Sequence, residues 1–171
     1  MRRLILLCLL LLLAAPSAAL ALRHAEGDGT LVVRNGIGVL RLEGPGAVIG
    51  RIEGGRLEVR SPGLEDCREL QVWGADRRPF LRTNEEGVTS CTFTERPFGG
   101  SPQPIRFRLI LRADDALSIR SGEGFGLSAV GEGRGLIRGA GGADGFYSLN
   151  GERFASLPDE GLAFSLAANL R

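Results

Sequence analysis

Residues 29–60 read GTLVVRNGIGVLRLEGPGAVIGRIEGGRLEVR, and this stretch decides the fold. Apolar residues alternate with polar ones in four short runs, as they do in strands with one buried face. The runs end at Asn35-Gly36, Gly44-Pro45-Gly46, Gly54-Gly55 and Ser61-Pro62-Gly63, and Asn-Gly is typical of a hairpin turn. No apolar period of 3.6 residues continues over two helical turns. The stretch therefore predicts four strands and no helix.

The same alternation returns after residue 104. Its most regular strand is residues 105–112, where Arg106, Arg108 and Arg112 share one face and apolar residues occupy the other. The middle of the chain is less regular, with edge strands expected near Leu70–Val72 and Phe80–Leu81 and a further strand at Thr89–Thr94. Residues 96–104 are expected to form a loop, because they hold three Pro and two Gly.

This spacing predicts an all-β sandwich or small barrel of about a dozen short strands with glycine-rich turns. A β-solenoid-like fold is the alternative. It is disfavoured by the hairpin signal at Asn35-Gly36 and by the lack of a regular repeat. The expected core comprises Leu31, Val33, Leu40, Leu42, Ile52, Leu57, Val59, Phe107, Leu109, Leu111, Ile119, Leu136, Phe146 and Leu162.

The N-terminus predicts export. Residues 1–21 begin with two arginines, continue with a run of ten apolar residues and end in small residues, as a cleaved signal peptide does. The apolar run is too short to span a bilayer, which requires about 20 residues. We expect no membrane-spanning segment after cleavage, and a periplasmic or extracellular location. Residues 22–28 are expected to be disordered, and residues 29–171 to form one all-β domain.

This domain has a faint internal echo. Residues 44–51 resemble residues 131–138, which fits two related halves, 29–63 and 105–157, around an insert at 64–104. Chance in a glycine-rich chain explains the echo equally well. The insert contains Cys67 and Cys91, and an even pair of cysteines in an exported chain predicts one disulfide. The alternative of a reactive thiol pair lacks Cys-x-x-Cys spacing.

The composition argues against several classes of function. The formal net charge is +1 and all 21 basic residues are arginine, so no basic nucleic-acid-binding surface, Schiff-base lysine or P-loop lysine is expected. The only histidine, His24, falls in the segment expected to be disordered, which argues against a Ser-His-Asp triad and multi-histidine metal sites. Glycine motifs at 122–126, 131–135 and 139–144 lack the helix or the ligand number that nucleotides or calcium require. We therefore expect no cofactor and no metal.

Two kinds of candidate site remain. Arg106, Arg108 and Arg112 fit an anionic glycan, a phosphate or a lipid headgroup, although a solvated face paired with glutamates on neighbouring strands explains them too. Trp73 and Tyr147 are expected to be packing residues. Carboxylate catalysis would have to use the adjacent pairs Asp114-Asp115, Glu85-Glu86 and Asp159-Glu160, but neighbouring residues on a strand or turn usually point apart.

Five segments of the chain resemble a group of small exported bacterial glycine-rich β-proteins to which no activity is assigned. These segments are Gly29–Val33, Gly44–Gly55, Ile105–Arg108, Gly131–Gly135 and Gly145–Gly151. The resemblance covers most of residues 29–157. It implies the fold and supplies no catalytic residue.

Together these observations predict a non-catalytic exported β-rich module of the cell envelope or periplasm. It would act by binding, or by structural association with, an unknown envelope protein or glycan. The alternatives are an anion- or glycan-binding protein that uses the arginine face, and a carboxylate-based glycan hydrolase.

Export can be tested directly. We expect the secreted chain to begin near Leu20 or Leu22, because small residues precede a cut after Ala19 or Ala21. Intact-mass measurement of the secreted product gives the new N-terminus. A secreted chain that keeps residues 1–19 would contradict the prediction.

Overall fold

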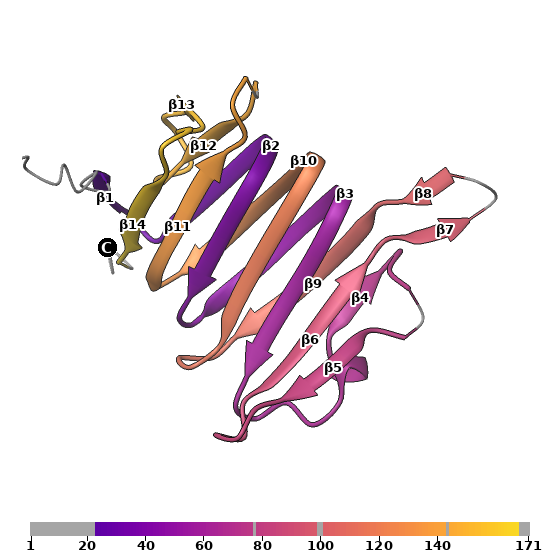
Figure 1. Ribbon diagram of the computed structural model, residues 1–171. Helices are drawn as coiled ribbons and strands as arrows, with labels where there is room; N and C mark the ends of the chain where they lie inside the picture. Colours follow the sequence, from indigo (N-terminus) through magenta and orange to yellow (C-terminus); the bar gives the residue numbers. More distant parts are fainter. Residues whose placement is uncertain (1–22, 77, 99–100, 143, 168–171) are drawn as a thin grey trace, which may run out of the picture.

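The computed structural model describes residues 23–76, 78–98, 101–142 and 144–167, and nearly all of their regular structure is β (Figure 1). The expected signal peptide lies outside the described residues. The strands are β1 (Arg23–Gly27), β2 (Thr30–Glu43), β3 (Gly46–Ser61), β4 (Gln71–Trp73), β5 (Phe80–Thr83), β6 (Thr89–Thr94), β7 (Arg96–Phe98), β8 (Ser101–Gln103), β9 (Ile105–Leu111), β10 (Ala116–Gly131), β11 (Gly133–Gly139), β12 (Phe146–Ser148), β13 (Ala155–Ser156) and β14 (Leu162–Leu166). One 3-10 turn, η1 (Cys67–Glu69), is capped by Asp66. The all-β prediction is confirmed.

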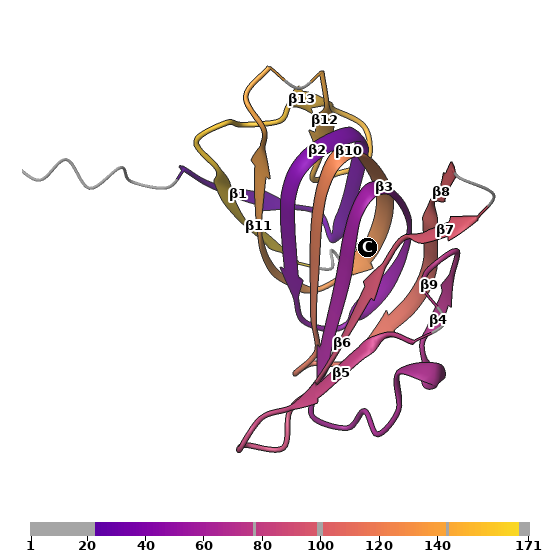
Figure 2. The ribbon, with the colours of Figure 1, turned by 45° about the vertical axis from the view of Figure 1, so that its right-hand side comes forward.

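Three long strands dominate the architecture. β10 lies between β2 and β3 and pairs antiparallel with both. All three arch over at one level, as Figure 2 shows, so that a single sheet folds back on itself. The arches are aligned because Ser121 in β10 lies opposite Gly38 in β2 and opposite Gly55 in β3. Glycine tolerates the backbone conformations that such sharp bends require.

The prediction of a hairpin at Asn35-Gly36 is wrong. Asn35 does adopt the left-handed conformation (φ 50°) typical of a turn. However, residues on both sides of it pair with β10 rather than with each other, so the dipeptide forms the bend inside β2. Gly54-Gly55 likewise lies at the bend inside β3 and does not separate two strands. The four strands expected in residues 29–60 are therefore two long ones.

The bends divide the sheet into two facing layers. Layer 1 contains the C-terminal halves of β2 and β3 and the N-terminal half of β10, flanked by β6 and β5 on one side and by β11, β14 and β1 on the other. Layer 2 contains the opposite halves of the same three strands, flanked by β9 and β4 on one side and by β12 and β13 on the other. The apolar core lies between the layers.

The chain coils through both layers. The turn at Gly44–Gly46 carries it from β2 in layer 1 to β3 in layer 2, and the turn at Gly131–Gly133 carries it from β10 in layer 2 to β11 in layer 1. These two turns, which share the echoed sequence, touch each other: the Glu132 N–H donates to the Pro45 carbonyl at 3.0 Å. The echoed segments therefore take equivalent places in the coil.

The core follows the predicted alternation in most strands. In β9, for example, buried and exposed residues alternate without a break from Ile105 to Leu111. The predicted burial is wrong for two of the expected core residues. Leu136 is only half-buried because its neighbour Ile137 faces inward, and Phe146 is 43% exposed on the short strand β12. Both lie where a run of two or three bulky residues leaves the phase of the strand undetermined.

Glycine lies opposite phenylalanine at three places in the core. Gly36 faces Phe125, Gly50 faces Phe107 and Gly135 faces Phe164, each as a direct cross-strand partner. A Cβ on Gly36 would lie 2.7 Å from Phe125 Cζ, and a Cβ on Gly50 or Gly135 would lie closer still to its ring. The rings therefore occupy the space that a side chain on the facing strand would need, and they cover its backbone.

A disulfide joins Cys67 in η1 to Cys91 in β6, as predicted. Both cysteines are buried, and β6 pairs with β3 from Thr89 to Thr94. Closing this loop stabilises the fold by about 3.5 kcal/mol on the chain-entropy model. The bond therefore fastens the irregular segment between β3 and β6 to the edge of layer 1.

Two segments are more regular than the sequence suggests. Residues 96–104, expected to be a loop, contain the β7–β8 hairpin, in which Pro97 lies opposite Pro102. Proline is tolerated there because a two-stranded ribbon has outer edges without ladder hydrogen bonds. Residues 23–27, expected to be disordered, form β1, which pairs in parallel with β14. β14 has an edge with free backbone groups, so residues 23–27 can pair with it although they have no apolar alternation.

The glycine–phenylalanine pairing predicts a stability effect. We expect Gly50→Ala to lower the free energy of unfolding by about 1–3 kcal/mol, because the new methyl group collides with the Phe107 ring. Gly124→Ala is the matched control, since no heavy atom lies within 4 Å of a Cβ there. Urea denaturation of both variants measures the difference. Adding Phe107→Leu to Gly50→Ala should recover part of the loss, whereas equal costs for both alanines would refute the packing argument.

Candidate functional site

The structure separates the three candidate arginines. Arg106 and Arg108 both point outward from β9 in layer 2. Arg112 follows β9 in the turn to β10, where its backbone N–H donates to Asp115 Oδ2 at 2.7 Å and its Nη1 lies beside Gly63, just after β3. The residue that continues the outward row of Arg106 and Arg108 is therefore Ile110.

Exposed apolar side chains surround the two arginines. Arg106 lies between Trp73 in β4 and Arg51 in β3, and Arg108 lies between Gln71 and Ile49. Ala47 connects Ile110 to Val130 in β10 in the next row. We call this surface the layer 2 face and define it by Ile49, Arg51, Trp73, Arg106, Arg108, Ile110 and Val130.

The apolar members of the layer 2 face are unusually exposed for large side chains. Trp73 is 55% exposed, Ile49 57%, Val130 59% and Ile110 73%. Single exposed apolar residues are common, but a contiguous group of them usually marks an interaction site. The neighbouring β10 positions, Gly126 and Ser128, carry little side chain and leave an open, shallow hollow of 530 Å³ beside Ile49 and Arg51. The expectation that Trp73 is a packing residue is wrong, because β4 is an edge strand that leaves the ring 55% exposed.

Two of the three arginines on this face are not neutralised by any described carboxylate. Neither Arg106 nor Arg108 forms an ion pair with any described carboxylate; Arg51 pairs with Glu53 at 2.7 Å. Arg106 also lies directly opposite Arg51, and like charges in that position repel. The alternative interpretation, arginines paired with glutamates on neighbouring strands, does not describe these two residues.

The outer surface of layer 1 provides a contrast within the same molecule. There Arg134 donates to Glu43 at 2.9 Å, Arg60 lies 3.7 Å from Glu58, and Arg138 Nε donates to the Asp159 carbonyl at 3.1 Å. None of the largest exposed apolar side chains lies on the three long strands of this layer. Three layer 1 arginines are therefore engaged with neighbouring groups, whereas Arg41, Arg56 and Arg120 form no ion pair with a described carboxylate. The flanking strand β5 exposes Phe80 and Leu81. Layer 2 differs in that large exposed apolar side chains lie on its long strands, beside its arginines.

Sequence reasoning found part of the layer 2 face. Alternation identified Arg106 and Arg108 as outward-facing but passed over Ile110, which has the same phase. Ile49 likewise lies at an outward position between Val48 and Gly50 in β3. An apolar residue at an outward position of a two-faced strand was the available signal. Nothing in the sequence indicates that β3, β9 and β10 bring these positions together.

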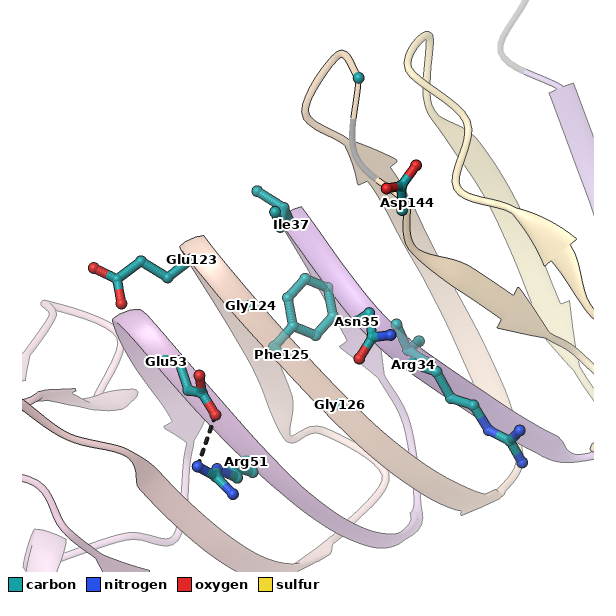
Figure 3. Close-up of a pocket in the computed structure, with 12 residues that line it drawn as sticks. Arg34, Asn35, Ile37, Arg51, Glu53, Glu123, Gly124, Phe125, Gly126 and Asp144 are labelled. Carbon is teal, nitrogen blue, oxygen red and sulfur yellow. Dashed lines mark ion pairs between the residues drawn. The ribbon is translucent and has the colours of Figure 1, made fainter.

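A second hollow, of 690 Å³, lies at the bends of the long strands (Figure 3). Glu53 in this hollow is turned toward Arg51, and Glu123 points away from Phe125, over the bend of β3. Arg34, at its other end, stacks on the Phe154 ring at 4.4 Å. Arg51, Glu53 and Arg34 are therefore engaged with neighbouring residues, and Glu123 points away from the hollow's aromatic ring.

The three adjacent acid pairs lie elsewhere and do not line this hollow. Asp115 accepts the Arg112 N–H, while its buried Oδ1 has no partner among the described residues. Glu85-Glu86 belongs to the turn between β5 and β6, where Asn84 Oδ1 accepts the Glu86 and Val88 N–H groups. Asp159-Glu160 precedes β14. The first two pairs are part of hydrogen-bonded turns, as is usual for acids in such positions.

His24 is ordered, contrary to expectation. It lies on β1 with its Nε2 3.3 Å from Ser165 Oγ, on an exposed surface. Its ring donates no hydrogen bond to a described carboxylate, so the third member of a triad is missing in this part of the chain. Among the described residues no group of three or more His, Cys, Asp or Glu is placed to hold a metal ion.

Comparison with known proteins finds no matching family model, no matching curated protein and no matching solved structure. Within the described ranges, no helix is long and apolar enough to cross a membrane. The layer 2 face is therefore the feature from which a function can be inferred.

If the arginines of this face serve binding rather than folding, their loss should cost little stability. We expect Arg106→Ser with Arg108→Ser to change the free energy of unfolding by less than about 0.5 kcal/mol per site, since no ion pair is broken. Relief of repulsion between Arg106 and Arg51 acts in the stabilising direction. Chemical denaturation checks this, and a loss above about 2 kcal/mol would assign the arginines a structural role.

Proposed function

We propose that this protein is an exported, non-catalytic binding module of the cell envelope or periplasm, and that the layer 2 face contacts its partner. The observation that carries the proposal is the grouping, on one sheet surface, of four exposed large apolar side chains with two arginines that form no ion pair with a described carboxylate. Interaction surfaces combine apolar anchors with charges that an uncomplexed protein leaves unsatisfied.

The strands beneath the layer 2 face are tightly packed, so the face can bind without rearranging. Gly50 and Phe107, directly beneath it, pack against each other across β3 and β9. A preorganised surface loses little conformational entropy when it binds. The Cys67–Cys91 disulfide favours an oxidising compartment, in agreement with the signal peptide expected at residues 1–21.

An anion- or glycan-binding protein is the second candidate function. Trp73 lies beside Arg106, and an aromatic ring next to a guanidinium is suited to a sugar that carries a carboxylate or sulfate. Arg112 does not belong to this candidate site, because its side chain lies by Gly63.

Binding to envelope material tests the proposal. We expect the mature, oxidised chain to sediment with envelope fractions of its source organism, because the apolar residues and arginines of the face become buried together. Ile49→Ser with Arg108→Ser should reduce the bound fraction at least tenfold, since the two residues are cross-strand neighbours at the centre of the face. The matched control is Leu136→Ser with Arg41→Ser, an equivalent neighbouring pair on the outer surface of layer 1.

Three results would contradict the proposal: no sedimentation with envelopes, equal binding of the face variant, or equal loss in the control. A glycan-hydrolysis panel on the pure chain runs in parallel. Measurable turnover there would favour the carboxylate hydrolase over the binding module.

A further inference from the structure

We propose that the partner of the layer 2 face is the surface of an anionic lipid bilayer, an inference that rests on the binding function proposed above. The face would lie flat on the headgroups, with its apolar side chains entering the interface and its arginines on lipid phosphates. The outer surface of layer 1 would then point away from the membrane.

The apolar part of the face favours lipid over glycan. Ile49, Ile110 and Val130 offer branched hydrocarbon and no hydrogen-bonding group, whereas sugar sites depend on directional polar contacts around an aromatic platform. A bilayer interface accepts aliphatic side chains at the acyl boundary and accommodates Trp at the headgroup level. Trp73, at the edge of the face, is the residue type that interfaces favour.

The arginines supply charge complementarity to that surface. Arg106 and Arg108 have no acidic partner among the described residues, and a guanidinium binds phosphate oxygens in a bidentate manner. Their aliphatic stems can lie along neighbouring apolar side chains while the charged ends reach the headgroups. Such a pair attracts anionic lipids and gains little from neutral ones.

The order of residues across the face agrees with this orientation. Ile110, Ala47 and Val130 form one cross-strand row, Arg108 and Ile49 belong to the next, and Trp73, Arg106 and Arg51 to the third. Because β3, β9 and β10 are neighbours in one layer, the rows form a continuous surface rather than a cleft. Such a surface matches an extended planar partner better than a ligand that must be enclosed.

The sole tryptophan of the chain gives a direct readout, because its emission reports only on this face. The mature, oxidised chain is titrated with vesicles of phosphatidylcholine alone and with vesicles that also contain phosphatidylglycerol. We expect a blue shift of Trp73 emission and co-sedimentation with the anionic vesicles only, both weakened by salt. Arg106→Gln with Arg108→Gln should lower the partition coefficient about 25-fold, roughly fivefold per arginine.

Two further variants separate the contributions. Ile49→Ser with Ile110→Ser should lower partitioning at least tenfold by removing apolar contact while preserving charge. Arg56→Gln with Arg120→Gln, a neighbouring pair in layer 1, removes the same charge from the opposite side and should change partitioning less than threefold.

The lipid inference is overturned if anionic vesicles cause no blue shift, or if neutral vesicles bind equally well. It is also overturned if a sulfated glycan or inorganic phosphate alone reproduces the shift, or if sedimentation shows that the face joins two copies of the chain. Face-dependent binding to whole envelopes without binding to pure lipid would leave the proposed binding function in place and refute the lipid surface.

Discussion

Three neighbouring strands that bend together at one level are the constraint on which the structure depends. The bend places the two halves of each of these strands, β2, β3 and β10, on opposite sides of the same core. The same three strands therefore contribute to both layers. Ser121 in β10 satisfies the irregular backbone there, because its Oγ accepts the Gly124 N–H at 3.0 Å and also donates to the Glu53 carbonyl. The fixed registers of the three strands in turn determine which side chains meet on the layer 2 face.

Sequence alternation predicts the buried face of most strands, but it does not predict how the strands are connected and paired. Alternation of apolar residues depends on neighbours in the chain, so Leu31, Leu40 and Phe107 could be assigned to the core. Asn35-Gly36 favours a local turn in either arrangement, and the choice between hairpin and bend is made by β10, which is distant in sequence. The same dependence on a distant partner, β14, explains why β1 was not expected. The β7–β8 hairpin is local, and its Pro and Gly content favoured a loop.

The candidate site was predictable to a similar extent. The outward phase of Arg106 and Arg108 follows from β9 alone, and Ile110 has the same phase. The departure of Arg112 from this row depends on the turn that Asp115 closes, and the exposure of Trp73 depends on β4 being the last strand beside β9. A surface assembled from β3, β4, β9 and β10 requires the sheet order, which periodicity does not contain.

The interleaved coil also determines the order in which the protein can be made. Of the three long strands, β2 and β3 leave the ribosome first, yet they do not pair with each other. The strand that separates them, β10, is synthesised only after the whole of the disulfide-bearing segment. The edges of β2 and β3 that pair with β10 therefore stay unpaired until β10 has been synthesised. Folding depends on the closure of long loops. Such a chain reaches its native sheet only late in synthesis, and nascent chains that end before residue 116 lack the middle strand that holds the two layers together.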